Sequence, residues 1–207
     1  PGQNGPFDIW SLGADGSEFE VVNQPAALGT TVECTACHNG VTPTLDTVLF
    51  PSGARINDAE AEARCMTCHQ GRGSTDQVNA AIETAAVGDD TVSSELGFIN
   101  QHYYAAGATL EAGRVRGAYQ YEGQVYDWRF RHVEDYDQCQ ECHDPHSLEL
   151  QIEACADCHT GVATVEDVRA IRIVASANQD YDGDGDVDEG IRDEIVGPDS
   201  LSSKLLA

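Results

Sequence analysis

Four copies of one five-residue pattern, CxxCH, constrain this 207-residue chain more than any other feature. They read CTACH, CMTCH, CQECH and CADCH, and together they use all eight cysteines. This pattern is the signature of covalent c-type haem attachment, in which two thiols add to the vinyl groups of the porphyrin and the next histidine ligates the iron. The residues that the four repeats predict to bind haem are Cys34, Cys37, His38, Cys65, Cys68, His69, Cys139, Cys142, His143, Cys155, Cys158 and His159.

Paired cysteines also occur in zinc sites and in disulfides. Two four-cysteine zinc sites would use all eight thiols, and an exported protein can hold disulfides. Neither alternative uses a histidine directly after each second cysteine, and the chain has only seven histidines in total. The sequence therefore favours four c-type haems over structural zinc or disulfides.

Three histidines outside the repeats are candidate distal ligands of the haem irons. They are His102, His132 and His146. His146 follows His143 after only two residues, one of them a proline that stiffens the link. It cannot reach the far face of the iron that His143 holds, so we expect it to ligate a different haem. The alternative is a surface histidine with no ligand role.

The histidine count predicts that one haem differs from the other three. Four haems with two imidazoles each need eight histidines, and the chain has seven. Met66 lies inside its own CMTCH repeat and cannot serve that haem, while Lys204, a tyrosine or the N-terminal amine are weaker candidates. The alternatives are an open, five-coordinate iron or a ligand from elsewhere. A histidine from a neighbouring copy does not repair the count, because every copy has seven.

The repeats divide the chain into an irregular lead-in (1–33), a tetrahaem core (34–163) and a C-terminal helix with an acidic loop (164–207). Short helices are predicted at 74–88, where Ser74 can cap the N-terminus, at 94–110, which carries His102, and at 164–177, which opens on a capping pattern. The alternating run 118–128 predicts a small β-hairpin. The fold class is thus mostly irregular, with a few short helices and a small hairpin, wrapped around four haems that compensate for a thin core.

An acidic run near the C-terminus, DYDGDGDVDEGIRDE, resembles a calcium-binding loop. Alternating carboxylates supply the hard oxygen ligands that calcium prefers, and the glycine at 185 permits the sharp turn. The last ligand position holds Ile191 instead of a glutamate, so Glu189, Asp193 or Glu194 has to substitute. The alternative is a solvated acidic loop. The predicted calcium ligands are Asp180, Asp182, Asp184, Asp186, Asp188 and Glu189.

The charge balance limits the partners of the chain. Lys and Arg number 11 against 36 Asp and Glu, which gives a formal net charge of -25. That charge argues against binding to nucleic acid or to an anionic membrane surface. No apolar run has the length of a membrane span, so the chain is not expected to be an integral membrane protein. The first residues show no export signal, and we expect a secreted, extracellular or cell-surface protein whose signal peptide has been removed.

Five segments carry a resemblance to a known family: FPSG (50–53), CMTCHQGRGS (65–74), FINQHYYAAGATL (98–110), GAYQYEGQVYDWRFRH (117–132) and CQECHDPHS (139–147). They resemble the secreted multihaem cytochromes of metal-respiring bacteria and archaea, most closely the tetrahaem OmcE-type cytochromes that polymerise into extracellular nanowires. The resemblance covers roughly residues 33–162. It implies stacked and T-shaped haem pairs in alternation, His102, His132 and His146 as distal ligands, and one distal histidine that crosses the subunit interface.

These observations predict an electron carrier and not an enzyme, because an iron with two imidazole ligands is closed to substrate. The expected form is a subunit of a conductive extracellular filament that passes respiratory electrons to external acceptors. Its expected partners are copies of itself and redox proteins or extracellular electron acceptors. One alternative is a soluble, monomeric tetrahaem shuttle in the periplasm or outside the cell. Another is a multihaem reductase that uses one open iron.

Overall fold

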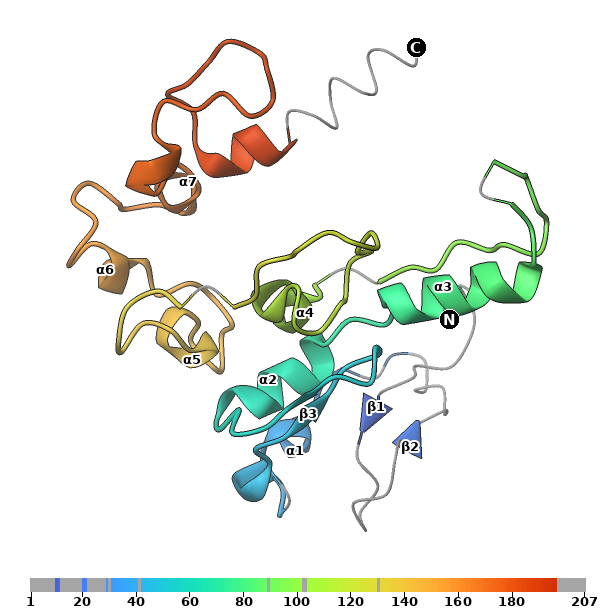
Figure 1. The fold of residues 1–207 in the computed structure, drawn as a ribbon. Helices are drawn as coiled ribbons and strands as arrows, with labels where there is room; N and C mark the ends of the chain where they lie inside the picture. Colours follow the sequence, from blue (N-terminus) through green and yellow to red (C-terminus); the bar gives the residue numbers. More distant parts are fainter. Residues whose placement is uncertain are drawn as a thin grey trace. The chain divides into compact units, whose positions relative to one another are not determined.

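The computed structural model describes residues 10–11, 20–21, 29, 31–40, 42–88, 90–101, 104–129 and 131–196. In this part of the chain, regular structure is limited to short helices and two-residue strands (Figure 1). The prediction of a mostly irregular fold with short helices and a small hairpin is confirmed. The chain divides into two compact units, residues 1–134 and 135–207, and the division falls between the second and third CxxCH repeats. The predicted boundaries after residues 33 and 163 stay predictions.

The first unit contains two antiparallel hairpins and four helices among its described residues. In chain order its elements are β1 (Trp10–Ser11), β2 (Glu20–Val21), α1 (Cys34–Cys37), the 3-10 turn η1 (Thr42–Thr44), β3 (Val48–Leu49), β4 (Arg55–Ile56), α2 (Glu62–His69), α3 (Thr75–Ala85) and α4 (Ala106–Glu111). The second unit contains α5 (Cys139–Cys142), α6 (Ile152–Cys155), α7 (Val165–Arg169), the 3-10 turn η2 (Val174–Ser176) and a helical turn at 191–196. None of the described helices has both the length and the apolar character that crossing a membrane requires.

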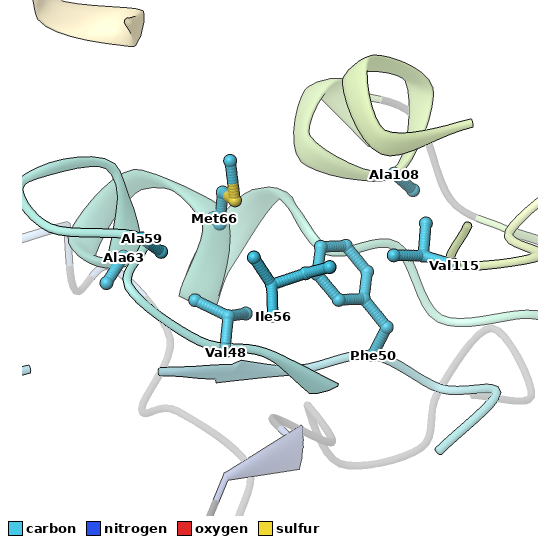
Figure 2. Close-up of a cluster of buried hydrophobic side chains, with 8 residues drawn as sticks. All are labelled: Val48, Phe50, Ile56, Ala59, Ala63, Met66, Ala108 and Val115. Carbon is cyan, nitrogen blue, oxygen red and sulfur yellow. The ribbon is translucent and has the colours of Figure 1, made fainter. Parts of the chain in front are cut away.

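The core of the first unit lies between the β3–β4 hairpin, α2 and α4 (Figure 2). Met66, the second residue of the CMTCH repeat, is 1% exposed and belongs to this core. Burying such a side chain stabilises the fold by roughly 1.5–3 kcal/mol, so the second repeat is anchored directly in the core. The buried members are Val48, Phe50, Ile56, Ala59, Ala63, Met66, Ala108 and Val115.

The FPSG run forms the turn of the β3–β4 hairpin. Gly53 adopts a positive φ of 83°, which glycine reaches without steric cost. Its N–H donates to the carbonyl of Phe50 at 2.8 Å. The hydroxyl of Ser52 donates to the carbonyl of Val115 at 2.6 Å, so the turn is also tied to the loop after α4.

The helix predicted at 74–88 is confirmed as α3. Ser74 is its N-cap and accepts a hydrogen bond from the backbone N–H of Gln77 at 3.3 Å. Asp76 lies in the first turn, where a negative charge offsets the helix dipole. The helix ends earlier than Gly88, because Ala86 takes the left-handed conformation with φ 51°.

The hairpin predicted at 118–128 was wrong, although Glu122 and Gly123 do form a turn. The hydroxyl of Thr75, at the start of α3, donates to the carbonyl of Ala118 and accepts from the N–H of Gln120, both at 2.9 Å. These bonds occupy backbone groups that a strand ladder would need. The hairpin of this fold is instead formed by earlier residues, at 48–56.

The helix predicted at 94–110 was wrong in its first half. Residues 96–101 are not helical, and α4 begins only at Ala106. His102 lies outside the described residues, so its predicted place on a helix stays a prediction. α4 packs closely on the end of α2, since a Cβ added to Gly107 would lie 3.0 Å from the carbonyl oxygen of His69.

The second unit has very little apolar core of its own. Among its described residues, Val162 is the only buried hydrophobic side chain. The helix predicted at 164–177 is confirmed only at its start, where Thr164 and Asp167 form the expected capping box of α7. It ends at Arg169, because Arg172 turns toward the acidic loop and donates to the carbonyls of Ser176 and Gln179 at 2.8 and 2.6 Å.

Candidate functional site

The first three CxxCH repeats lie on short helices or directly at their ends, and the fourth forms a turn that begins at Cys155, the last residue of α6. In three repeats the histidine N–H donates to the carbonyl of the first cysteine, at 2.7 Å for His38, 2.8 Å for His143 and 2.9 Å for His159. In the second repeat, His69 is the last residue of α2. Residues three and four apart are neighbours on a helix, so the two thiols and the imidazole of the second repeat share one side of α2.

None of the eight cysteines, all of which lie within the described residues, is in a disulfide. The described residues also hold no group of three cysteine or histidine side chains close enough to bind one metal ion. Each repeat presents two cysteine side chains and one imidazole, which is the set of groups that a c-type haem requires.

Two of the four repeat histidines are held by a backbone carbonyl. The Nδ1 atom of His69 lies 2.6 Å from the carbonyl oxygen of Tyr104, and that of His143 lies 3.1 Å from the carbonyl oxygen of Leu148. A carbonyl oxygen only accepts, so Nδ1 carries the proton and Nε2 keeps its lone pair. That is the arrangement in which a histidine typically ligates a metal through Nε2.

The residues that supply these two carbonyls share an uncommon backbone conformation. Tyr104 has φ 59° and Leu148 has φ 63°, in the left-handed region that residues other than glycine rarely adopt. Both side chains are exposed, at 77% and 70%, so burial of the side chains does not account for the conformation. The conformation instead coincides, in both cases, with the hydrogen bond to a repeat histidine.

The thiols of neighbouring repeats lie within electrostatic reach of one another, in one pair for each unit. Burial raises the pKa of Cys68, and negative charge on Cys37 and then Cys65 raises it further. Burial likewise raises the pKa of Cys142, followed by the effect of Cys155 and Glu141. The first and second repeats thus interact electrostatically in one unit, as do the third and fourth in the other, where the N–H of Gln151, just before α6, also donates to the carbonyl of Cys142 at 2.9 Å.

The structure describes two of the three histidines that lie outside the repeats. His132 and His146 are exposed, and His102 lies outside the described residues. The backbone N–H groups of His146 and Ser147 donate to Asp144, at 2.9 and 2.6 Å, which fixes the turn after the third repeat. The predicted distal roles of these three histidines stay predictions.

The acidic loop brings its carboxylates together in two groups. One group consists of Asp180, Asp182 and Glu194, and the other of Asp182, Asp184 and Glu189. The predicted ligands Asp186 and Asp188 belong to neither group; the carboxylates of Asp184 and Asp186 instead accept the N–H groups of Asp186 and Asp188, at 2.7 and 2.9 Å. The calcium prediction therefore stays a prediction, with its strongest geometric support at Asp182, Asp184 and Glu189.

Glu189 and Glu194 have different surroundings, although either could replace the missing last ligand. Desolvation raises the pKa of Glu189, and the charges of Asp184 and Asp182 raise it further, so this carboxylate lacks a compensating cation. Its buried Oε1 accepts no hydrogen bond. Glu194 instead pairs with Arg172 at 2.6 Å and accepts the N–H of Tyr181 at 2.6 Å.

Comparison with protein families, with curated proteins and with solved structures finds no match to this chain. The case for its function therefore rests on the residues of the chain itself. Sequence reasoning missed two features of the site, the carbonyls of Tyr104 and Leu148 and a buried ion triad around Arg129. No short motif marks either feature, because each depends on contacts formed by the folded chain.

Proposed function

We propose that this chain is an electron carrier that binds four c-type haems covalently at its CxxCH repeats. The observation that carries the proposal is the shared arrangement of the repeats, in which two cysteines that are in no disulfide and one histidine lie within a single five-residue turn. When bound, the haem iron supplies one-electron redox chemistry. The chain supplies tethering by the thiols and orientation of the imidazoles, most visibly at His69 and His143.

The pairing of the repeats supports a relay between closely spaced centres. The charge of Cys37 raises the pKa of Cys68, and that of Cys155 raises the pKa of Cys142, and each unit contains two attachment sites. Electron transfer between centres requires such proximity, and the protein contributes it by folding two repeats into one unit. The thin core supports the same proposal, because the second unit buries only Val162 among its described hydrophobic residues. Large apolar groups bound within it would supply the missing core.

We also propose that copies of this chain assemble head to tail into a conductive extracellular filament. Residues 31–40, which include the whole first repeat, are exposed among the described residues. Apolar groups attached there would be exposed too, and burying them against the next copy is favourable. Repeated head-to-tail contacts that do not close into a ring produce a helical filament. His132 and His146 are exposed and hence accessible to a neighbouring copy.

Electrostatic repulsion between copies of the chain opposes assembly. Copies at a net charge of -25 repel one another, and salt weakens that repulsion. A histidine that ligates an iron of the next copy would hold the contact against the remaining repulsion. Assembly should therefore depend on haem loading and on one of the three spare histidines.

A calcium ion in the acidic loop is the remaining part of the proposal. Its support is the alternating pattern of aspartates together with the uncompensated carboxylate of Glu189. Calcium prefers carboxylate and carbonyl oxygens and would relieve the repulsion among Asp182, Asp184 and Glu189. Its role would be structural, since the loop belongs to the part of the second unit that follows the last repeat.

Removal of one repeat at a time tests the haem-binding proposal. Replacing both cysteines of a repeat by alanine, for example Cys34 and Cys37, should lower the haem content from four to three and leave the other haems reducible. Thr35→Ala, between the same two cysteines, is the matched control and should keep all four. Haem content and reversible reduction are measured by visible absorption during a potentiometric titration. Unchanged haem content in a cysteine variant would contradict the proposal.

Electron microscopy tests the filament proposal. Native material should form filaments, and alanine replacement of each spare histidine should leave two variants filamentous and one monomeric. Native protein that stays monomeric at high concentration, with salt and calcium present, would favour the soluble shuttle. Turnover of a small oxidant, such as peroxide, by one haem would favour the reductase.

A further inference from the structure

Three charged side chains form a buried ion triad next to the second repeat. One guanidinium nitrogen of Arg129 lies 2.7 Å from Glu62 and 3.1 Å from Glu111. Their side chains are 10%, 5% and 1% exposed, respectively. Desolvation acts to lower the pKa of Arg129, but hydrogen bonds and charges of the two glutamates outweigh it and raise the pKa, so the cation is firmly held.

The triad joins the elements that carry and support the second repeat. Glu62 is the first residue of α2 and lies three residues before Cys65, so the two are neighbours on the helix surface. Glu111 is the last residue of α4. The segment just before Arg129 is bound to the end of α4, where the N–H of Gly113 donates to the carbonyl of Asp127 at 2.9 Å.

The charges of the triad do not cancel. Two carboxylates and one guanidinium leave one net negative charge buried in the triad, at the start of the helix that carries Cys65 and Cys68. Arg114 lies 3.5 Å from Glu111, but its side chain is 42% exposed, so water weakens its effect. A buried charge is screened far less than a surface charge and acts more strongly on a neighbouring redox centre.

We propose that the Arg129–Glu62–Glu111 triad sets the reduction potential of the haem at the second repeat, keeping it more negative than its ligands alone would. The inference rests on the proposed function of the chain. A fixed negative charge stabilises the ferric over the ferrous state, because the ferric state carries the additional positive charge. Arg129 acts here as a positioning residue that holds the two carboxylates together and offsets one of them.

Glu111→Gln is the most direct test, since it keeps the size of the side chain and removes one unit of charge. The expected result is a positive shift of one of the four midpoint potentials, by about tenfold in the reduction equilibrium, or about 59 mV for one electron. The shifted haem should be the one that is lost when Cys65 and Cys68 are replaced by alanine. Its EPR spectrum should be unchanged, because the ligands remain in place.

A matched control makes the same chemical change at an exposed ion pair. Glu166 pairs with Arg169 at 3.3 Å, and its side chain is 76% exposed. Glu166→Gln should leave all four potentials unchanged within error. If Glu111→Gln shifts no potential more than Glu166→Gln does, the inference is wrong.

Substitutions of Arg129 separate an electrostatic effect from a loss of structure. Arg129→Gln adds net negative charge and should shift the same potential in the negative direction, whereas Arg129→Lys should leave it nearly in place. Shifts of the same sign in Glu111→Gln and Arg129→Gln would indicate a structural disturbance and overturn the inference.

If Glu111→Gln does not retain its haems, Glu62→Gln removes the same charge and gives the same test. A chain without covalent haem refutes the proposed function itself, a result distinct from four haems with unmoved potentials.

Discussion

The imidazole of His69 is bound to the backbone of Tyr104, with 2.6 Å between Nδ1 and the carbonyl oxygen. Thirty-five residues separate them in the sequence. Tyr104 holds a positive φ of 59° at this contact, and Leu148 holds one of 63° where its carbonyl meets His143. The left-handed conformation costs a residue with a side chain about 1–2 kcal/mol, so the surrounding fold has to hold it in place. We infer that both residues serve to orient a repeat histidine.

Substitution of Leu148 tests this orienting role. Leu148→Gly should retain the contact with His143 and change the free energy of unfolding by less than about 1 kcal/mol, because glycine adopts a positive φ without steric cost. Leu148→Val should lower the free energy of unfolding by about 1 kcal/mol or more, since a β-branched residue strongly disfavours that conformation. Denaturant titration gives the stability, and EPR gives the state of the haem at the third repeat. Identical behaviour of the two variants would argue against the role.

The count of seven histidines predicts that one haem differs in ligation from the other three. EPR of the fully oxidised protein should show a minority high-spin or other species that lacks two imidazoles, beside a low-spin majority. Four indistinguishable low-spin haems with two imidazoles each would contradict this prediction.

Local signals in the sequence were sufficient where a structure depends on neighbouring residues. The Ser74 cap of α3 and the capping box at the start of α7 are of this kind. The predicted hairpin at 118–128 failed because Thr75, more than forty residues away, takes up its backbone groups. Arg129 and Glu62 are in contact although 67 residues separate them in the sequence, and no pattern along the chain predicts this contact.

The acidic loop is a second case in which contacts with residues outside the local pattern could not be predicted from the sequence. The aspartate pattern predicts a calcium loop, and in the structure the carboxylates of Asp182, Asp184 and Glu189 lie close together. Glu194 also lies close to the aspartates of the loop, and its carboxylate forms an ion pair with Arg172, which precedes the loop in the sequence. Sequence alone could name Glu194 as a substitute ligand, but only the fold shows that it already has a cationic partner.

Two glutamate variants should separate the proposed calcium ligand from the structural carboxylate. Glu189→Gln should weaken calcium binding by at least about tenfold, with little effect on the calcium-free protein. Glu194→Gln should destabilise the loop with or without calcium, by about 3–5 kcal/mol, because it leaves Arg172 buried without its charged partner. Calorimetry with calcium and limited proteolysis of residues 178–207 provide the readouts. Absence of calcium from purified protein at millimolar supply would identify the loop as a solvated acidic segment.

The capping box of α7 should make this helix sensitive to acid. The backbone N–H of Ala163 and the hydroxyl and N–H of Thr164 donate to Asp167 and hold its pKa below the ordinary value. A lowered folded-state pKa means that Asp167 contributes stability above the ordinary pKa, near about 4, and that this contribution is lost as the pH falls through the folded-state pKa.

Amide hydrogen exchange across α7 checks this prediction as a function of pH. Asp167→Asn should remove the acid-dependent change in protection of the helix, and Thr164→Ala should cost about 0.5–2 kcal/mol of local stability by removing the N-cap. Glu166→Gln, at an exposed position of the same helix, is the control and should keep the pH dependence. Acid sensitivity that persists in Asp167→Asn would assign the effect to another group.

The intact mass of the purified protein under denaturing conditions tests the central claim most directly. Because thioether bonds survive denaturation, the mass should equal that of the chain plus four haems, and none of the eight cysteines should react with a thiol reagent. A mass equal to the bare chain, with eight reactive thiols, would contradict the account.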